Sequence, residues 1–281
     1  MKIVSTVEEV RNIIKVVKKE GKSVGFVPTM GYLHDGHLSL VDKANDENDF
    51  VVVSIFVNPT QFGPNEDLDR YPRDLKRDES LLIDRDVDLL FYPDVKTMYP
   101  EGFKTYVNVE DITEPLCGGK RPGHFRGVAT VVCKLFNIVM PDKAYFGLKD
   151  YQQYLVIKTM AKDLNFDIDI IGMPIVREAD GLAMSSRNVY LKGDERESAL
   201  SLNRSFAIVE EYLKKRVRDP YIIVDAIEKF ISSHPYTKID YVEIVDKDSL
   251  KRINKIDGSF LLALAVFVNK TRLIDNKIFE V

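Results

Sequence analysis

Residues 23–40 constrain the fold of this chain most strongly, because they combine a buried strand, a tight turn and the start of a helix. An apolar run at 24–27 leads through Pro-Thr-Met-Gly at 28–31 into His-Asp-Gly-His at 34–37, where an apolar helical pattern begins. A strand that ends in a glycine-bearing turn before a helix is typical of nucleotide sites in α/β proteins. The sequence therefore predicts a nucleotide site at this turn.

His34 and His37 are the polar side chains that this turn offers to a ligand. Residues three apart at a helix start lie on one face of the helix. The helix N-terminus beside them has free backbone N–H groups and a partial positive charge, and both favour phosphate. We predict that the two histidines donate to the same phosphate group. The alternative is an ordinary strand-to-helix turn with two solvated histidines.

Strand runs and helical patterns alternate through residue 176, which favours a Rossmann-like, doubly wound parallel sheet. The expected strands are 24–27, 50–57, 89–92, 143–146 and 167–176, together with an exposed strand at 104–109. The expected helices include 7–17, 74–85, 128–139 and one that the 147–153 stretch opens and that runs to about residue 164. After about residue 190 the pattern changes to helices at 194–215 and 221–233 and strands at 239–245, 260–268 and 271–274. We therefore predict an α/β domain at 1–176 and a smaller α+β domain at 177–281.

Polar residues follow the ends of two predicted strands. Asn58 and Gln61 come after 50–57, and Gly147, Lys149 and Asp150 come after 143–146. Ligands of open α/β sheets bind beyond the carboxyl ends of the strands, so these residues are expected beside the histidines. The alternatives are an Asn-Pro turn with a solvated glutamine, and a simple helix cap by Asp150.

Three loops add charge or hydroxyl groups. A glycine-rich loop at 118–127 carries Arg121 and His124 and suits a phosphate or a carboxylate, the alternative being a flexible solvated loop. The run Met-Ser-Ser-Arg at 184–187 combines hydroxyls with an arginine, which together can hold a triphosphate. A charged loop at 66–73 is expected to cover the site and keep water from a reactive intermediate.

Composition argues against several classes of function. The chain has 281 residues, of which 45% are hydrophobic and 30% charged, and its net charge of −4 argues against a general nucleic-acid binder. No apolar run reaches membrane-spanning length, and residues 1–20 contain no signal-peptide core, so we expect a soluble cytoplasmic protein with no membrane partner. Cys117 and Cys133 are expected to be reduced thiols.

Five motifs, taken in order, resemble the pantothenate synthetase family, the ligases that join pantoate to β-alanine with ATP. They are the turn and histidine pair at 28–37, Asn-Pro-Thr-Gln-Phe at 58–62, Arg-Pro-Gly-His-Phe at 121–125, Lys-Asp-Tyr-Gln-Gln at 149–153 and Met-Ser-Ser-Arg-Asn at 184–188. The resemblance covers essentially the whole chain. It implies a cytoplasmic homodimer that uses ATP and Mg²⁺, with residues 177–281 closing over the ATP site.

The resemblance also implies roles for single residues. The expected ATP contacts are Met30, Gly31, His34, His37, Gly147, Lys149, Asp150, Val176, Met184, Ser185, Ser186 and Arg187. His37 would be the general acid, and Gln61 and Gln153 would hold pantoate, with Gln61 also near β-alanine. The further candidates for substrate binding are Asn58, Tyr71, Arg121 and His124. Leu148 stands where a glutamate is common in the family.

The expected reaction begins with a carboxylate, which must be activated because it is a poor acylating agent. Its oxygen attacks the α-phosphate of ATP, pyrophosphate leaves, and the amine of β-alanine then attacks the acyl carbon and releases AMP. Charge builds on phosphate oxygens, so the site needs preorganised donors. The catalytic candidates are His34, His37, Lys149, Ser185, Ser186 and Arg187. The sequence identifies no metal ligands.

Three other classes of protein are alternative interpretations of the sequence. A class I aminoacyl-tRNA synthetase relative shares the histidine motif, but the acidic balance and the small C-terminal domain argue against tRNA binding. The pair Gln61 and Gln153 suits a small hydroxy acid and argues against another HIGH-motif adenylyltransferase that releases an adenylated product. Histidine and lysine at strand ends argue against a non-catalytic nucleotide-binding module. The product formed from ATP, pantoate and β-alanine distinguishes all of them.

Overall fold

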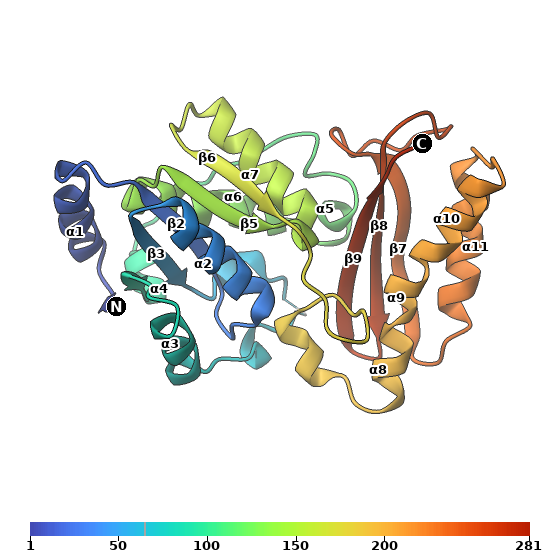
Figure 1. Cartoon of the computed structure of the whole chain (residues 1–281), viewed down its shortest axis with the longest axis horizontal. Coiled ribbons are helices and arrows are strands. Elements are labelled where there is room, and N and C mark those ends of the chain that lie inside the picture. Colours follow the sequence, from blue (N-terminus) through green and yellow to red (C-terminus); the bar gives the residue numbers. More distant parts are fainter. Residues whose placement is uncertain (65) are drawn as a thin grey trace. The chain divides into compact units, whose positions relative to one another are not determined.

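The computed structural model of the chain describes residues 1–64 and 66–281, which form two compact units. The first unit comprises Met1–Glu110, Arg121–Leu148 and Gln153–Pro174, and the second comprises Asp111–Lys120, Lys149–Gln152 and Ile175–Val281. The first is α/β and the second is α+β, which confirms the predicted fold class (Figure 1). The chain passes for the last time into the second unit at Pro174 and Ile175.

The first unit is built on a six-stranded parallel sheet with the order β1-β4-β3-β2-β5-β6. Its strands are β1 (Lys2–Val4), β2 (Val24–Thr29), β3 (Phe50–Ile55), β4 (Leu89–Phe91), β5 (Lys143–Gly147) and β6 (Asp169–Met173). The chain adds β3 and β4 on one side of β2, and β5 and β6 on the other. The strand order therefore reverses between β2 and β5, where the carboxyl ends of such sheets bind ligands.

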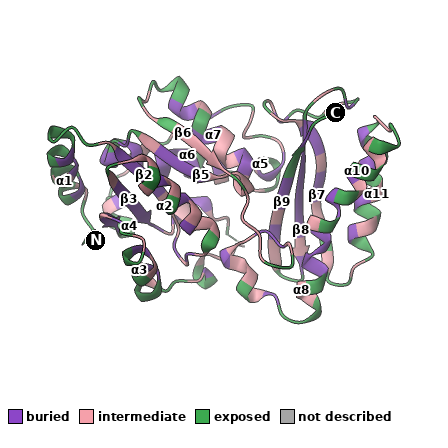
Figure 2. Ribbon diagram, viewed as in Figure 1, coloured by how far each residue is buried: buried purple, intermediate pink, exposed green. Residues whose placement is uncertain are grey.

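Helices cover both faces of this sheet. They are α1 (Val7–Lys19), α2 (Asp35–Glu47), α3 (Leu75–Ile83), α4 (Val95–Met98), α6 (His124–Val139) and α7 (Tyr151–Asp163), with 3₁₀ turns η1 (Pro59–Gln61) and η2 (Leu68–Arg70). Leu38 of α2 and Leu82 of α3 share one core with Val27 and Val53 of the sheet. Phe26 points to the opposite face and is also fully buried, and α6 contacts its strand. Burial on both faces explains the uninterrupted apolar runs of β2 and β3 (Figure 2).

The second unit is built on an antiparallel sheet with the order β7-β8-β9. Its elements are α5 (Cys117–Lys120), 3₁₀ turns η3 (Leu148–Asp150, which begins in the first unit) and η4 (Ser186–Tyr190), α8 (Asp194–Ala199), α9 (Ser201–Arg204), α10 (Phe206–Lys214), α11 (Pro220–Ser232), β7 (Thr237–Asp246), β8 (Phe260–Val268) and β9 (Thr271–Phe279). Phe206 and Ile227 of the helices share a core with Leu262 and Leu264 of β8. No helix in the described part of the chain is long and apolar enough to cross a membrane.

Several element predictions differ from the structure. The short edge strand β1 was not predicted, and β6 is shorter than the expected 167–176. The expected helix at 194–215 is three helices, because Ser201 and Ser205 bond their hydroxyls to the carbonyls three residues earlier, at 2.6 and 2.7 Å. The tentative strand at 271–274 is the first part of a nine-residue strand, β9.

The prediction of an exposed strand at 104–109 is wrong. This segment of the described chain is extended but joins neither sheet. Its backbone is held instead by a side chain, since the Val107 N–H donates to Thr130 Oγ1 of α6 at 3.0 Å. The Arg126 guanidinium lies 4.0 Å from the ring centroid of Tyr106. Alternation of apolar and polar residues therefore reflects packing on a helix here, and not pairing in a sheet.

Candidate active site

The two histidines lie together at the start of α2. The turn after β2 contains two residues with positive φ, Gly31 at 81° and Tyr32 at 52°. His34 immediately precedes α2, and its carbonyl accepts hydrogen bonds from the backbone N–H groups of His37 at 2.8 Å and Leu38 at 3.0 Å. The two imidazole centroids are 4.0 Å apart. The local sequence therefore brings both rings to one place.

Asp78 of α3 holds this turn in shape. Its carboxylate is buried and accepts from the backbone N–H groups of Tyr32 at 2.7 Å and Leu33 at 2.8 Å. Burial raises the pKa of Asp78, although these two hydrogen bonds act in the opposite direction. A Cβ on Gly31 would lie 2.9 Å from the Ile55 side chain and 3.1 Å from the Asp78 carboxylate, so glycine is required. No local sequence pattern predicts this role of Asp78, because its contact with Tyr32 joins residues 46 positions apart in the chain.

Asn58 and Gln61 form a buried amide pair beyond the end of β3. Asn58 Nδ2 donates to Gln61 Oε1 at 2.9 Å and to the carbonyl of Gly127 at 3.2 Å. Asn58 Oδ1 accepts from the Tyr99 hydroxyl at 2.9 Å, so both ends of the Asn58 amide bind the protein. Because the Gln61 oxygen is occupied, Gln61 offers amide N–H donors, which suit a carboxylate or a hydroxyl of a small acid.

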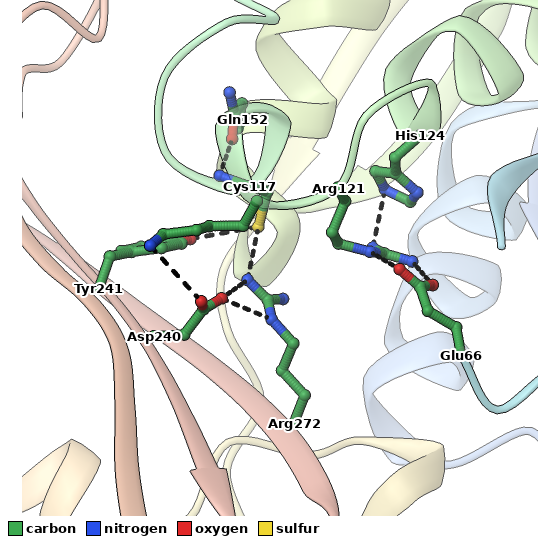
Figure 3. A network of polar contacts seen from close by, with 9 residues as sticks. Glu66, Cys117, Arg121, His124, Gln152, Asp240, Tyr241 and Arg272 are labelled. Carbon is green, nitrogen blue, oxygen red and sulfur yellow. Dashed lines mark hydrogen bonds and ion pairs between the residues drawn. The ribbon is translucent and has the colours of Figure 1, made fainter. Parts of the chain in front are cut away.

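Arg121, His124 and Glu66 form a polar network (Figure 3). Two of its members, Arg121 and His124, also contact the backbone of Gln61. Arg121 pairs in a bidentate way with Glu66, with Nε donating to Oε1 at 2.7 Å and Nη2 donating to Oε2. The Gln61 carbonyl lies 3.2 Å from Arg121 Nη2 and 2.8 Å from His124 Nδ1. Arginine only donates, so His124 Nε2 accepts from Arg121 Nη1 at 3.1 Å and the imidazole proton is on Nδ1. Burial acts to raise the pKa of Glu66, but Arg121 holds it below its usual range.

Two loops that are predicted to bind or cover substrate, at 66–73 and 118–127, contain the residues of this network. Arg121 and His124 have protein partners in the structure, so the ion pair with Glu66 limits the donors that Arg121 can offer to a substrate. In the predicted covering loop, Tyr71 is buried and its ring centroid is 5.9 Å from that of Phe62. Residue 65, next to the start of this loop, lies outside the described residues.

The residues after β5 divide between the two units. Gly147 ends β5 in the first unit, whereas Lys149 and Asp150 belong to the second. Lys149 Nζ is 3.8 Å from Asp150 Oδ2. The adjacent glutamines differ, because the buried Gln152 bonds through its amide to backbone groups of the 112–117 segment. Gln153 is partly exposed and belongs to the first unit, and its contact with a ligand stays a prediction.

A hairpin leads into the Ser-Ser-Arg run of the second unit. The Val176 carbonyl accepts from the Met184 N–H at 3.0 Å, and Arg177 pairs with Ala183 in an antiparallel bridge. Val176 and Met184, both predicted to contact ATP, are therefore opposite each other at the open end of this hairpin.

Ser185, Ser186 and Arg187 follow directly at η4. The Ser185 hydroxyl accepts from the backbone N–H of Arg187 at 3.2 Å. Ser186 is buried, and Arg187 is partly exposed. The next residue, Asn188, ties the run back to the hairpin, since its Nδ2 donates to Glu178 Oε1 at 2.5 Å and to the Ala183 carbonyl at 3.1 Å. The run is therefore part of one local structure with the hairpin.

Each unit thus contains groups whose chemistry suits anions. The first contributes the two imidazoles and the Gln61 amide, and the second contributes an ammonium, two hydroxyls and a guanidinium at Lys149 and residues 185–187. Such donors stabilise negative charge on phosphoryl and carboxyl oxygens. In the part of the chain that the structure describes, no group of three or more His, Cys, Asp or Glu residues could hold a metal ion.

Comparisons with known proteins agree with this chemistry over the whole chain. A family model described as pantoate-beta-alanine ligase matches residues 2–278. The pantothenate synthetase of Caldicellulosiruptor saccharolyticus is 58% identical over 281 residues, covering 100% of both chains. A crystal structure of pantothenate synthetase from Thermus thermophilus is 48% identical, with a TM-score of 0.93 and 99% of each chain covered.

A further solved relative carries ligands in its description. It is the pantoate-beta-alanine ligase from Francisella tularensis complexed with beta-gamma ATP and beta-alanine. This structure is 38% identical to the chain, with a TM-score of 0.83, and covers 99% of this chain and 97% of the relative.

Proposed function

The chain belongs to the pantoate–β-alanine ligase family and catalyses pantothenate formation with ATP as co-substrate, and we propose that it does so through a pantoyl-adenylate intermediate. The observation that carries this mechanism is the pair of imidazoles at the start of α2, with ring centroids 4.0 Å apart. They follow β2, at the side of the sheet where the strand order reverses. Donors at this position suit the α-phosphate of a bound nucleotide.

The first unit acts on the acid and on the α-phosphate. Gln61 and Gln153 hold pantoate through amide donors, and Gln61 also lies near β-alanine. Asn58 supports this role by fixing the Gln61 amide, with which it shares a 2.9 Å hydrogen bond. His34 holds the α-phosphate, and His37 acts as the general acid. Met30, Gly31 and Gly147 bring backbone close to the nucleotide, and Tyr71, Arg121 and His124 complete the proposed substrate contacts.

The second unit acts on the rest of the nucleotide. Lys149, Ser185, Ser186 and Arg187 stabilise the negative charge that moves onto pyrophosphate as it leaves. Their chemistry supports this, because an ammonium, a guanidinium and two hydroxyls can all donate hydrogen bonds to phosphate oxygens. Asp150, Val176 and Met184 are the other proposed ATP contacts.

The reaction has two steps that need no enzyme nucleophile. In the first, a pantoate carboxylate oxygen attacks the α-phosphorus of ATP and the bond to pyrophosphate breaks. In the second, the β-alanine amine attacks the acyl carbon, loses a proton, and the bond to AMP breaks. Since both nucleophiles are substrates, the protein must bind, orient and neutralise charge.

Three broader properties also belong to this proposal. Mg²⁺ commonly binds through substrate phosphates with few protein ligands, so we expect it to arrive with ATP. The family resemblance supports a homodimer. The same resemblance and the two free cysteines, Cys117 and Cys133, support a cytoplasmic location.

Isotope exchange tests the adenylate mechanism directly. With protein, Mg²⁺, ATP and pantoate, labelled pyrophosphate is expected to exchange into ATP when β-alanine is absent. Omitting pantoate is expected to abolish the exchange, because no nucleophile then reaches the α-phosphate. Stoichiometric ADP and inorganic phosphate, or exchange that requires β-alanine, would contradict the mechanism.

A further inference from the structure

Two adjacent residues of β9, Asp275 and Asn276, reach the two ATP-binding segments proposed for the second unit. Both are buried, with 2% and 8% of their surfaces exposed. Successive residues of a strand point to opposite faces, so the pair acts on both sides of the sheet. Asp275 is in register with Leu264, a core residue on the helix-covered face, and Asn276 therefore points to the other face.

Asp275 binds the hairpin that carries the Ser-Ser-Arg run. Its two oxygens accept from both terminal nitrogens of Arg177, Oδ2 from Nη1 at 2.7 Å and Oδ1 from Nη2 at 2.9 Å. The same Arg177 Nη1 also donates to the Gly181 carbonyl at 3.1 Å, which closes the hairpin on itself. A bidentate pair of this kind fixes the orientation of both partners. The position of residues 184–187 therefore depends on a carboxylate nearly 100 residues away in sequence.

Asn276 binds the segment that carries Lys149. Its Nδ2 donates to the Lys149 carbonyl at 2.8 Å. Its own backbone N–H donates to Asp275 Oδ1 at 2.8 Å, which links it to the carboxylate that holds Arg177. Gln152 holds the far end of the same segment through the 112–117 backbone.

The 112–117 segment is itself attached to the three-stranded sheet. The Cys117 thiol lies 3.2 Å from the Tyr241 hydroxyl and 3.5 Å from Arg272 Nη2, and Arg272 pairs with Asp240 at 2.9 Å (Figure 3). Burial raises the pKa of Tyr241, so its phenol stays neutral as a hydrogen-bonding group. Lys149 is thus connected to the three-stranded sheet through the Asn276 bond and through Gln152 and Cys117.

We propose that Asp275 and Asn276 are positioning residues that hold Lys149 and residues 184–187 as one preorganised ATP-binding group. This inference rests on the proposed function for the ATP contacts. Preorganisation matters because donors that are already in place need no rearrangement as charge moves onto pyrophosphate. Neither residue touches ATP in this proposal, since each acts through the segment that it binds.

Hydrogen exchange on the full chain measures positioning without relying on activity. Asp275→Asn keeps the side-chain volume but removes one acceptor from Arg177, and we expect amide exchange at 177–188 to accelerate at least about threefold. Asn276→Leu removes the donor to Lys149, so exchange is expected to accelerate at 147–152 instead. Should Asp275→Asn fail to fold, Arg177→Lys keeps the charge and loses the bidentate geometry at a partly exposed position.

Steady-state kinetics of the same variants test whether the positioning of these two segments contributes to ATP binding. Loss of one charge-assisted hydrogen bond corresponds to a change of about tenfold, and loss of one neutral hydrogen bond to a smaller one. We therefore expect the ATP KM to rise about tenfold in Asp275→Asn and less in Asn276→Leu, with the pantoate KM unchanged within twofold in both. Lys277→Met is the matched control, because Lys277 lies on the same strand but pairs with Glu210 of α10. This control is expected to leave both exchange and ATP kinetics unchanged.

Two results would overturn the proposal in distinguishable ways. Unchanged exchange at 177–188 and 147–152 would show that β9 does not position these segments, whatever the kinetics. Accelerated exchange with an unchanged ATP KM would show that β9 positions these segments but that they do not contribute to ATP binding. That result would also overturn their assignment as ATP contacts in the proposed function.

Discussion

The histidine turn of the first unit and the Ser-Ser-Arg run of the second are built in different ways, although both are proposed to bind ATP. The turn follows a buried strand and precedes a helix, so most of its geometry is local, with both histidines within four residues. The Ser-Ser-Arg run follows a hairpin whose Arg177 is fixed by Asp275, 98 residues away. One region is an intrinsic strand–turn–helix, and the other depends on a strand near the end of the chain.

The two regions also share one structural feature, a buried aspartate. In each, a buried aspartate from another element holds the segment: Asp78 binds two backbone N–H groups of the turn, and Asp275 binds the Arg177 side chain. A buried carboxylate is costly unless its hydrogen bonds are made, so each aspartate specifies one arrangement of its partner. Local sequence therefore selects the type of structure at each segment, and an aspartate far away in the sequence fixes the position of that segment.

The largest expected effect concerns the local region. His37→Ala and His34→Ala each remove a donor proposed to face the α-phosphate, and we expect pyrophosphate exchange to fall about 10²–10³-fold, or about 2.7–4 kcal/mol. His234→Ala is the matched control, because His234 lies at the end of α11, where its Nδ1 is 2.9 Å from the Phe230 carbonyl. Near-normal exchange in both folded variants would remove the histidines from the mechanism.

The next effect separates acid binding from nucleotide binding. Gln61→Ala and Gln153→Ala remove amide donors to pantoate, so we expect its KM to rise by at least about tenfold, corresponding to about one hydrogen bond to a charged group. The KM for ATP is expected to change less than twofold, as measured in the same steady-state assay. Equal effects on both substrates would reassign these glutamines to the nucleotide.

Substitution of Asp78 tests whether a buried aspartate is needed to hold the histidine turn. Asp78→Ala leaves the N–H groups of Tyr32 and Leu33 unsatisfied, and we expect a loss of about 1–3 kcal/mol per buried group in the free energy of unfolding. Asp78→Asn keeps one acceptor oxygen and is expected to lose less. Denaturant unfolding measures both variants, and wild-type stability for Asp78→Ala would show that the turn holds itself.

The pH dependence of Asp78 has a defined sign. Burial raises its pKa in the folded protein, so its contribution to stability is present below its ordinary pKa and is lost as the pH rises through the folded value. We therefore expect wild type to gain stability relative to Asp78→Asn as the pH falls from 7 toward 4. Thermal unfolding across this range tests the sign, and a relative loss of stability at acid pH would contradict it.

The smallest expected effect concerns Glu66, whose contact with Arg121 is a partly exposed ion pair within the first unit. Glu66→Gln keeps the shape but removes the charge, and partly exposed ion pairs contribute only about 0.2–1 kcal/mol. We expect the pantoate KM to change less than about fivefold. A lower KM would indicate that freed Arg121 binds the substrate carboxylate, and a higher one that Arg121 acts by holding Gln61.

Much of the fold was accessible from the sequence because its signals are local. The buried runs of β2, β3 and β5 and the helical pattern of α1 each lie within one element. The segment at 104–109 shows the limit of such signals, because alternation cannot distinguish a strand from an extended chain that packs on a helix. Short β1 carried too few residues to show any period.

The residues proposed for the site are identifiable in the sequence, since imidazole, amide, hydroxyl and guanidinium groups occur in ordered motifs near predicted strand ends. The tertiary structure shows which neighbours hold them: Asp78 at the turn, Asn58 at Gln61, and Asp275 and Asn276 in the second unit. It also shows that the two adjacent glutamines differ, because the Gln152 amide bonds to backbone groups whereas Gln153 is partly exposed. The physical reason is that a hydrogen bond depends on distance in space, which residues far apart in the chain acquire only when it folds.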